Sequence, residues 1–325
     1  MRMSHRIRVY TMLVSIPLAL LFLMMGVSPA AAQGTQEQHS QPRTWHVLVS
    51  IDNTNHDIMG MAFLPSHIWI NEGDTVVWTA NSAEPHTVTF LSKGQEEPKF
   101  DPNSPTQNLP QGSKVYDGHS YYNSGLISSM PGAFPGGTSY SLTFPNAGTF
   151  HYGCLLHPMM DGVVKVREEG TPYPYTQQQY DQKAQQQGNA ILQDGNELAK
   201  EAGEHSNNHH VSVGADDGVA MVMRFFPSNV TIHVGDTITF KDRYPIDDPH
   251  TVSFGNVQEP FPPVTPIGDP RNFVGQTLNS GLLGTDTSWI SRTVGNVYKV
   301  TYNKAGTYQF FCFIHFGMAI NIVVK

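Results

Sequence analysis

The feature of this sequence that most constrains its fold is an internal repeat. Met61–Ser66 matches Met223–Ser228, and Asn71–Thr75 matches His233–Thr237 at the same separation along the chain. Further matching segments follow in the same order: Pro85–Phe90 with Pro249–Phe254, Ser124–Leu126 with Ser280–Leu282, and Ala147–Phe150 with Ala305–Tyr308. Ordered matches at a nearly constant spacing indicate a duplicated domain.

The periodicity within each copy is that of short β-strands. Residues 67–79 and 229–241 each contain two β-branched or aromatic runs separated by Gly-Asp. Further segments are expected to be strands: 140–144, 149–152 and 163–166 in the first copy, and 297–302, 307–311 and 320–324 in the second. Regular short strands between turn residues predict an all-β sandwich in each copy.

The segment between the copies, 176–208, is rich in Gln, Glu, Asp and Lys and has few large apolar residues. We expect a solvated linker, partly helical at most, because Gly188 and Gly195 lower the helix propensity. The expected division of the chain is a first domain at 44–167, a linker at 168–209 and a second domain at 210–325.

The N-terminal segment 1–32 differs in composition from the rest of the chain. Three arginines near the N-terminus precede a nearly all-apolar run over 9–27, and Ala30–Ala32 supplies small residues for cleavage. This pattern predicts a secretory signal peptide over 1–32 and an exported protein, periplasmic or extracellular. The alternative is a retained membrane anchor, because the apolar run over 9–27 is just long enough to span a bilayer.

Removal of that segment makes the chain more acidic. The full sequence has 19 basic and 27 acidic residues, and the segment 1–32 contains three arginines and no acid, so the mature chain carries 16 − 27 = −11. No basic stretch remains to follow a phosphate backbone, which disfavours nucleic-acid binding. The acidic balance favours a basic protein partner.

Each copy ends in the pattern Cys-x-x-His-x-x-Met and has a histidine far upstream. The candidate metal ligands are His86, Cys154, His157 and Met160 in the first copy, and His250, Cys312, His315 and Met318 in the second. A thiolate, two imidazoles and a thioether form a soft ligand set, and trigonal His₂Cys with a long axial Met is the arrangement of a blue-copper electron-transfer site. Met160 is favoured over Met159 because Gly317 matches Met159 in the second copy.

Other interpretations of these residues are disfavoured by the duplication. Cys154 and Cys312 stand at equivalent points of separate domains, which argues against a disulfide between them even in an exported protein. A zinc site would use Cys and His without the Met. The remaining alternative is a buried Cys beside core Met, which does not account for two matching copies.

Several histidines lie outside this pattern. His151 is three residues before Cys154, so on a strand its side chain faces away from the cysteine, and we expect a structural or surface role. His205, His209 and His210 cluster near the end of the linker, where the alternatives are weak copper binding and plain solvation.

The segments 148–160 and 306–318 resemble the C-terminal copper loop of the cupredoxins, the domains resemble the plastocyanin/amicyanin-like members, and the short Cys-x-x-His-x-x-Met loop is most similar to that of the amicyanins. The resemblance covers most of both domains. It implies a Greek-key β-sandwich in each, a type 1 copper bound by each His, Cys, His and Met set, and one-electron transfer. Many family members have Asn after the first histidine, where this chain has Thr87 and Thr251. A hydroxyl can make some of the same hydrogen bonds.

The resemblance also implies that the ring edge of the C-terminal histidine lies near the surface, inside an apolar patch. The patches would contain Leu155, Leu156, Pro158 and Met159 in one domain, and Phe313, Ile314 and Phe316 in the other. Such patches suit a transient redox protein partner such as a cytochrome or copper protein. The alternative is that they pack against the other domain or within a homo-oligomer.

The function expected from these residues is electron transfer by an exported carrier with two type 1 copper ions, rather than catalysis. A copper enzyme of the nitrite reductase or multicopper oxidase type would need further coppers, held by His-x-His pairs and by histidines flanking the cysteine. No His-x-His occurs in the sequence, and Gly153 and Leu155 flank Cys154. A third possibility is copper storage or tolerance, which would favour clustered ligands, whereas the 13 Met here are scattered or lie within the segment 1–32.

Overall fold

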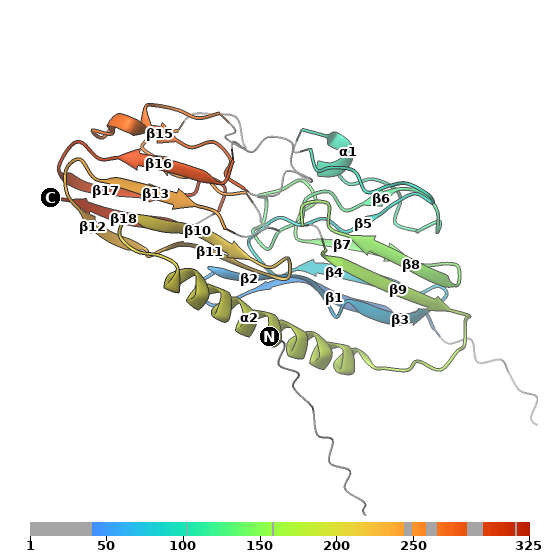
Figure 1. Ribbon diagram of the computed structural model, residues 1–325. Coiled ribbons are helices and arrows are strands. Elements are labelled where there is room, and N and C mark those ends of the chain that lie inside the picture. The colour runs from blue at the N-terminus through green and yellow to red at the C-terminus, as the bar shows by residue number, and fades with distance from the viewer. Residues whose placement is uncertain are drawn as a thin grey trace, which may run out of the picture. The chain divides into compact units, whose positions relative to one another are not determined.

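The computed structural model describes residues 41–101, 103–157, 159–243, 249–257, 265–284, 295–315 and 317–325 (Figure 1). The predicted signal peptide over 1–32 therefore lies outside the described residues. Within these ranges, no helix combines the length and the apolar character that a membrane crossing requires.

The two copies have the same described strands in the same order. The first copy contains β1 (Thr44–Asp52), β2 (Ile58–Leu64), β3 (His67–Asn71), β4 (Thr75–Ala80), β5 (Thr89–Phe90), β6 (Tyr122–Asn123), β7 (Ser139–Thr143), β8 (Gly148–Gly153) and β9 (Asp161–Arg167). The second contains β10 (His210–Asp216), β11 (Ala220–Phe226), β12 (Asn229–Ile232), β13 (Thr237–Lys241), β14 (Ser253–Phe254), β15 (Leu278–Asn279), β16 (Val297–Thr301), β17 (Gly306–Phe311) and β18 (Ala319–Val324). Two short helices, α1 (Pro105–Asn108) and η1 (Pro270–Asn272), lie in the long loops.

In each copy these strands form two layers. One layer has the order β3-β9-β8-β5-β6 in the first copy and β12-β18-β17-β14-β15 in the second. The facing layer has the order β2-β1-β4-β7 and β11-β10-β13-β16. The predicted all-β fold of two tandem Greek-key sandwiches is confirmed, and every strand expected from the periodicity is present.

Aromatic side chains fill the space between the layers. The alternation of β4, with every second residue buried, places Trp78 in the core of the first copy, where its ring lies 5.2 Å from that of Tyr152 and 5.9 Å from that of Phe90. Phe240 takes the place of Trp78 in the second copy, 6.2 Å from Phe310. Each rigid core therefore supports β8 or β17, the strand that ends at the candidate cysteine.

The two copies join through β2 and β11, which pair antiparallel and complete one eight-stranded sheet. Met59 pairs with Met221, its own equivalent in the repeat, and Ile58 pairs with Val222. Equivalent residues therefore meet around a local two-fold axis, as in the isologous interface of a dimer. The pairing also satisfies backbone groups that an exposed sheet edge would leave open.

The segment between the copies forms one long helix, α2 (Gln177–Glu204), which contacts strands of both copies (Figure 1). It begins at a capping box formed by Thr176 and Gln179. Its buried side consists largely of small residues and includes Ala184, Gly188, Gly195, Ala199 and Ala202. The linker is polar as predicted, but the expectation of a solvated segment holds for only one side of this helix.

The glycine at position 195 permits the close approach of α2 to the sheet. A Cβ added there would overlap Ile58 Cγ2, whereas a Cβ at Gly203 of the same helix would meet nothing within 4 Å. Replacing Gly195 by Ala is expected to lower the thermal midpoint, because overpacking costs about 1–3 kcal/mol and exceeds the roughly 1 kcal/mol gained in helix propensity. Gly203→Ala is the matched control and is expected to leave the midpoint unchanged or raise it. Equal shifts for both variants would contradict the close packing of α2.

Candidate metal centres

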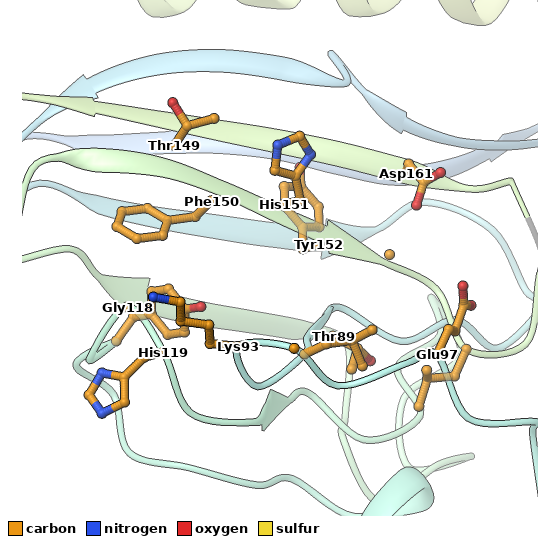
Figure 2. A pocket seen from close by; sticks show the side chains of 15 residues that line it. Thr89, Lys93, Glu97, Gly118, His119, Thr149, Phe150, His151, Tyr152 and Asp161 are labelled. Atoms are coloured by element: carbon orange, nitrogen blue, oxygen red, sulfur yellow. The ribbon is translucent and has the colours of Figure 1, made fainter.

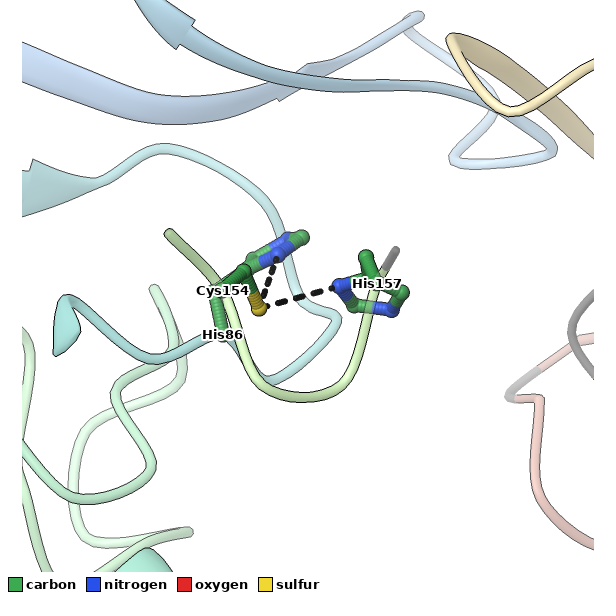
Figure 3. A group of neighbouring side chains, drawn as sticks. All are labelled: His86, Cys154 and His157. Carbon is green, nitrogen blue, oxygen red and sulfur yellow. Dashed lines mark hydrogen bonds between the residues drawn. The ribbon is translucent and has the colours of Figure 1, made fainter. Parts of the chain in front are cut away.

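The first candidate site lies where three segments of the first copy meet. Cys154 directly follows β8, and the turn that carries His157 leads back into β9. His86 stands before β5 and is held by backbone hydrogen bonds in both directions with Ile127, each 2.9 Å. Cys154 Sγ lies 3.4 Å from His157 Nδ1 and 3.9 Å from His86 Nδ1 (Figure 3). All three side chains are buried.

The second site repeats this geometry. Cys312 Sγ lies 3.6 Å from His315 Nδ1 and 3.9 Å from His250 Nδ1, and the two ring nitrogens are 2.9 Å apart. His250 is held by the same pair of backbone hydrogen bonds, here with Leu283. Within the described ranges, these two His/Cys/His groups are the clusters whose ligand atoms all lie within 4.8 Å of one another.

Backbone hydrogen bonds close the turn that follows each cysteine. The N–H of Cys154 donates to the C=O of Met160 at 3.0 Å, and the N–H of Met160 donates to the C=O of His157 at 3.2 Å. Met160 is buried in this turn, and so is Met318 in the second. Cys312, His315 and Met318 also line one common cavity. Each methionine thus lies in the same turn as the cysteine and the second histidine of its predicted ligand set.

The threonine after each upstream histidine ties the two parts of the site together. The N–H of Thr87 donates to Cys154 Sγ at 3.3 Å, and Thr87 Oγ1 accepts from the N–H of Leu155 at 2.9 Å. Thr251 makes the same pair of contacts, with Cys312 Sγ at 3.3 Å and the N–H of Phe313 at 2.7 Å. The expectation that a hydroxyl makes such hydrogen bonds in place of an asparagine is confirmed.

Burial determines the protonation states of the metal-free sites. It lowers the pKa of His86 to about 3 and that of His315 to about 4, so both imidazoles are neutral near pH 7. Burial also raises the pKa of the Cys154 thiol to about 11, although the hydrogen bond from Thr87 N–H acts in the opposite direction. The pKa of His157 is held well below its ordinary value by burial, then by His86, and also by His315 of the other domain.

These donor atoms fit a soft metal ion. In each site two neutral imidazole nitrogens and one sulfur converge in a buried space. A bound cation would occupy the point that these lone pairs face and would deprotonate the thiol. A sulfur, two nitrogens and a neighbouring thioether suit copper rather than magnesium or calcium, which take oxygen ligands.

The second histidine of each site, whose ring edge was predicted to lie near the surface, is largely buried. His157 is 4% exposed and His315 is 3% exposed. Of the predicted patch residues, Leu155 is buried and Met159 is 58% exposed, while Pro158 and Phe316 lie outside the described residues. For His315 the alternative of packing against the other domain is supported, because its Nε2 lies 3.8 Å from Glu84 Oε1 of the first domain.

The described histidines outside the two clusters include exposed ones, and neither cysteine forms a disulfide. His151 is exposed and lines a cavity of the first domain that none of the predicted ligands lines (Figure 2). His209 is exposed, with its Nε2 3.3 Å from Asp236 Oδ2. Cys154 and Cys312 are both free and buried, each in its own domain.

Comparison with known proteins identifies the family. The chain belongs to the copper binding proteins of the plastocyanin/azurin family, which match residues 49–167 and 209–325. Copper is thus the metal of this family, and each domain offers one candidate His/Cys/His site for it.

Individual relatives match one domain length at a time. Amicyanin of Paracoccus denitrificans is 29% identical over 110 residues, which cover 34% of this chain and 62% of that protein, less than two thirds of its length. Plastocyanin of Cucumis sativus is 28% identical over 107 residues, covering 33% of this chain and 88% of the plastocyanin. A solved copper(I) amicyanin variant aligns at 22% identity and a TM-score of 0.25 over 38% of this chain and 82% of that one.

The buried histidines predict how the metal-free protein responds to acid. An unfolded imidazole binds a proton below its ordinary pKa of 6.5, whereas the folded His86 does so only near pH 3. Between pH 6.5 and about pH 3 the unfolded state therefore binds more protons than the folded state. The stability of the folded protein that is present above pH 6.5 is lost as the pH falls through this range. Each such histidine contributes a slope of up to about 1.4 kcal/mol per pH unit.

The measurement is the free energy of unfolding in urea over this pH range, with a chelator present. His86→Gln is expected to reduce the slope. His119→Gln is the control, because that side chain is 68% exposed and lies outside both sites. A stability that does not fall between pH 6.5 and pH 4 would contradict neutral, buried histidines in both sites.

Proposed function

We propose that this chain is an exported one-electron carrier with a type 1 copper in each domain. The observation that carries the proposal is the duplicated, buried His/Cys/His cluster, which repeats nearly the same distances in both copies. The proposed ligands are His86, Cys154, His157 and Met160 in the first domain, and His250, Cys312, His315 and Met318 in the second. The proposed domains are 44–167 and 210–325, and the family match over nearly the same residues supports them.

The chain's own residues would hold each ligand in place during a change of oxidation state. The backbone hydrogen bonds of the Cys154 turn, the bonds of His86 to Ile127, and the Thr87 contacts fix the donors on a packed core. A rigid donor set limits reorganisation, which favours fast electron transfer. Copper would supply the one-electron redox couple and the thiolate-to-metal charge transfer.

Export and a protein redox partner belong to this proposal. The composition of the segment 1–32 supports export, and the charge of −11 (16 − 27) on the remaining chain supports a basic partner. Relatives named plastocyanin and amicyanin support electron transfer over catalysis. Copper storage and a copper enzyme remain the competing functions for the experiments below to distinguish.

Copper loading is expected to give an intensely coloured protein with two coppers per chain. Cys154→Ser should remove about half of the charge-transfer absorbance, and Cys312→Ser the other half, because each site depends on its own thiolate. Metal analysis and visible absorbance spectra make the measurement. A colourless protein that binds zinc as readily as copper would exclude type 1 sites.

An anaerobic redox titration of the loaded chain separates the candidate functions. Two reversible copper potentials and no third copper are expected for an electron carrier. A further copper with turnover of a small substrate would favour an enzyme, and bound copper that does not change its oxidation state would favour storage.

A further inference from the structure

A ligand of the second site touches the first domain. His315 Nε2 lies 3.8 Å from Glu84 Oε1, and the side chains of these residues are only 3% and 16% exposed. Glu84 is two residues before His86 in the sequence. The domain interface therefore brings the ligand loop of one candidate copper site against a ligand of the other.

The orientation of the His315 ring gives this contact a chemical role. Its Nδ1 faces Cys312 Sγ at 3.6 Å, so Nε2 lies on the far side of the ring. When Nδ1 binds a metal, Nε2 must carry the ring proton. Metal-bound histidines donate that proton to a carboxylate, a carbonyl or water, which fixes the ring. Glu84 places a carboxyl oxygen on that side of the ring.

The same loop holds the outer nitrogen of His86 in the first site. Ser82 Oγ lies 3.2 Å from His86 Nε2, and the Ser82 hydroxyl contacts the backbone C=O of Glu84 at 3.4 Å. With a metal on His86 Nδ1, the Nε2–H would donate to Ser82 Oγ, and the Ser82 O–H would donate to the Glu84 carbonyl. The contacts from His86 through Ser82 and Glu84 to His315 then join an imidazole of the first site to one of the second.

We propose that Glu84 bridges the two copper sites and that one electron passes between them within the chain through its contact with His315. This inference rests on the proposed function, because it requires a type 1 copper in each site. The step moves one electron and no proton: one copper goes from Cu(I) to Cu(II), the other from Cu(II) to Cu(I), and no bond forms or breaks. A one-electron donor protein reduces one of the two sites, and a one-electron acceptor protein oxidises the other.

The interface is built to keep this contact in place. The β2–β11 pairing joins the two domains by backbone hydrogen bonds, and the flanking bonds Met61 N–H to Val219 C=O, at 2.7 Å, and Met223 N–H to Asp57 C=O, at 2.9 Å, extend it. Because the two sites are held together within one chain, their exchange is first-order and does not depend on protein concentration.

The experiment uses the full copper-loaded chain, oxidised at both sites. A radiolytically produced radical delivers less than one electron per chain, and optical and freeze-quench EPR spectra follow its redistribution. Cys154→Ser and Cys312→Ser supply the reference spectra of single sites and cannot show exchange. The wild type is expected to show a first-order phase whose rate is independent of protein concentration.

Glu84→Ala is expected to slow that phase several-fold while the colour of both sites is retained. Glu84→Gln should keep most of the rate, because its amide oxygen can take the place of Glu84 Oε1 beside His315 Nε2. Glu97→Ala is the matched control, a carboxyl of the same domain that lines the cavity of Figure 2, and it should change nothing. In the metal-free protein, the ¹⁵N resonance of His315 Nε2 should shift in Glu84→Ala and not in Glu97→Ala.

The outcomes separate this inference from the proposed function. A loaded chain without blue, redox-active copper would overturn the proposed function itself. Two blue, reversible sites without a concentration-independent phase would overturn only the exchange. A Glu84→Ala variant with the wild-type rate and an unshifted His315 resonance would overturn the bridging role of Glu84.

Discussion

The antiparallel pairing of β2 (Ile58–Leu64) with β11 (Ala220–Phe226) is the contact on which the rest of the arrangement depends. Backbone hydrogen bonding at two sheet edges is directional, and pairing Met59 with its own equivalent Met221 sets the two domains around a local two-fold axis. Without this register the domains would be independent units on a linker. With it, α2 has a continuous sheet to cover, and His315 reaches Glu84 of the other domain.

The sequence predicted the strands and the two His/Cys/His clusters well, because the strands and the Cys-x-x-His part of each cluster depend on local spacing. Cys-x-x-His-x-x-Met is short enough that one turn between two strands brings its members together, and the repeat located the upstream histidines. The pairing between copies was not predicted, since edge pairing uses backbone groups and leaves no side-chain pattern. The sequence of Ile58–Leu64, apolar without alternation, indicates only a strand covered on both faces, and the core and α2 provide that cover.

The length of helix α2 was also underestimated from the sequence. Gly188 and Gly195 lower intrinsic helix propensity, and this argued against a long helix over 177–204. Tertiary packing outweighs that cost, because glycine lets the helix backbone approach Ile51 and Ile58 where any Cβ would collide. Small residues at positions 184, 188, 195, 199 and 202 lie on the buried side of α2. Their spacing, which follows one face of a helix, was the sequence pattern that indicated a packed helix.

The two sites share a donor set but differ around the upstream histidine. In the second site, Gly214, with φ of +71°, lies so close to His250 Nε2 that a side chain at this position would collide with the ring. The matching residue of the first copy is Ser50, which stands in the equivalent β-bulge and also has a positive φ. His86 Nε2 contacts Ser82 instead. Because outer partners of metal-bound histidines tune the metal, these unequal surroundings would give the two proposed copper sites unequal potentials. An unequal pair held in one chain would give the proposed electron exchange a direction, which two identical sites would lack.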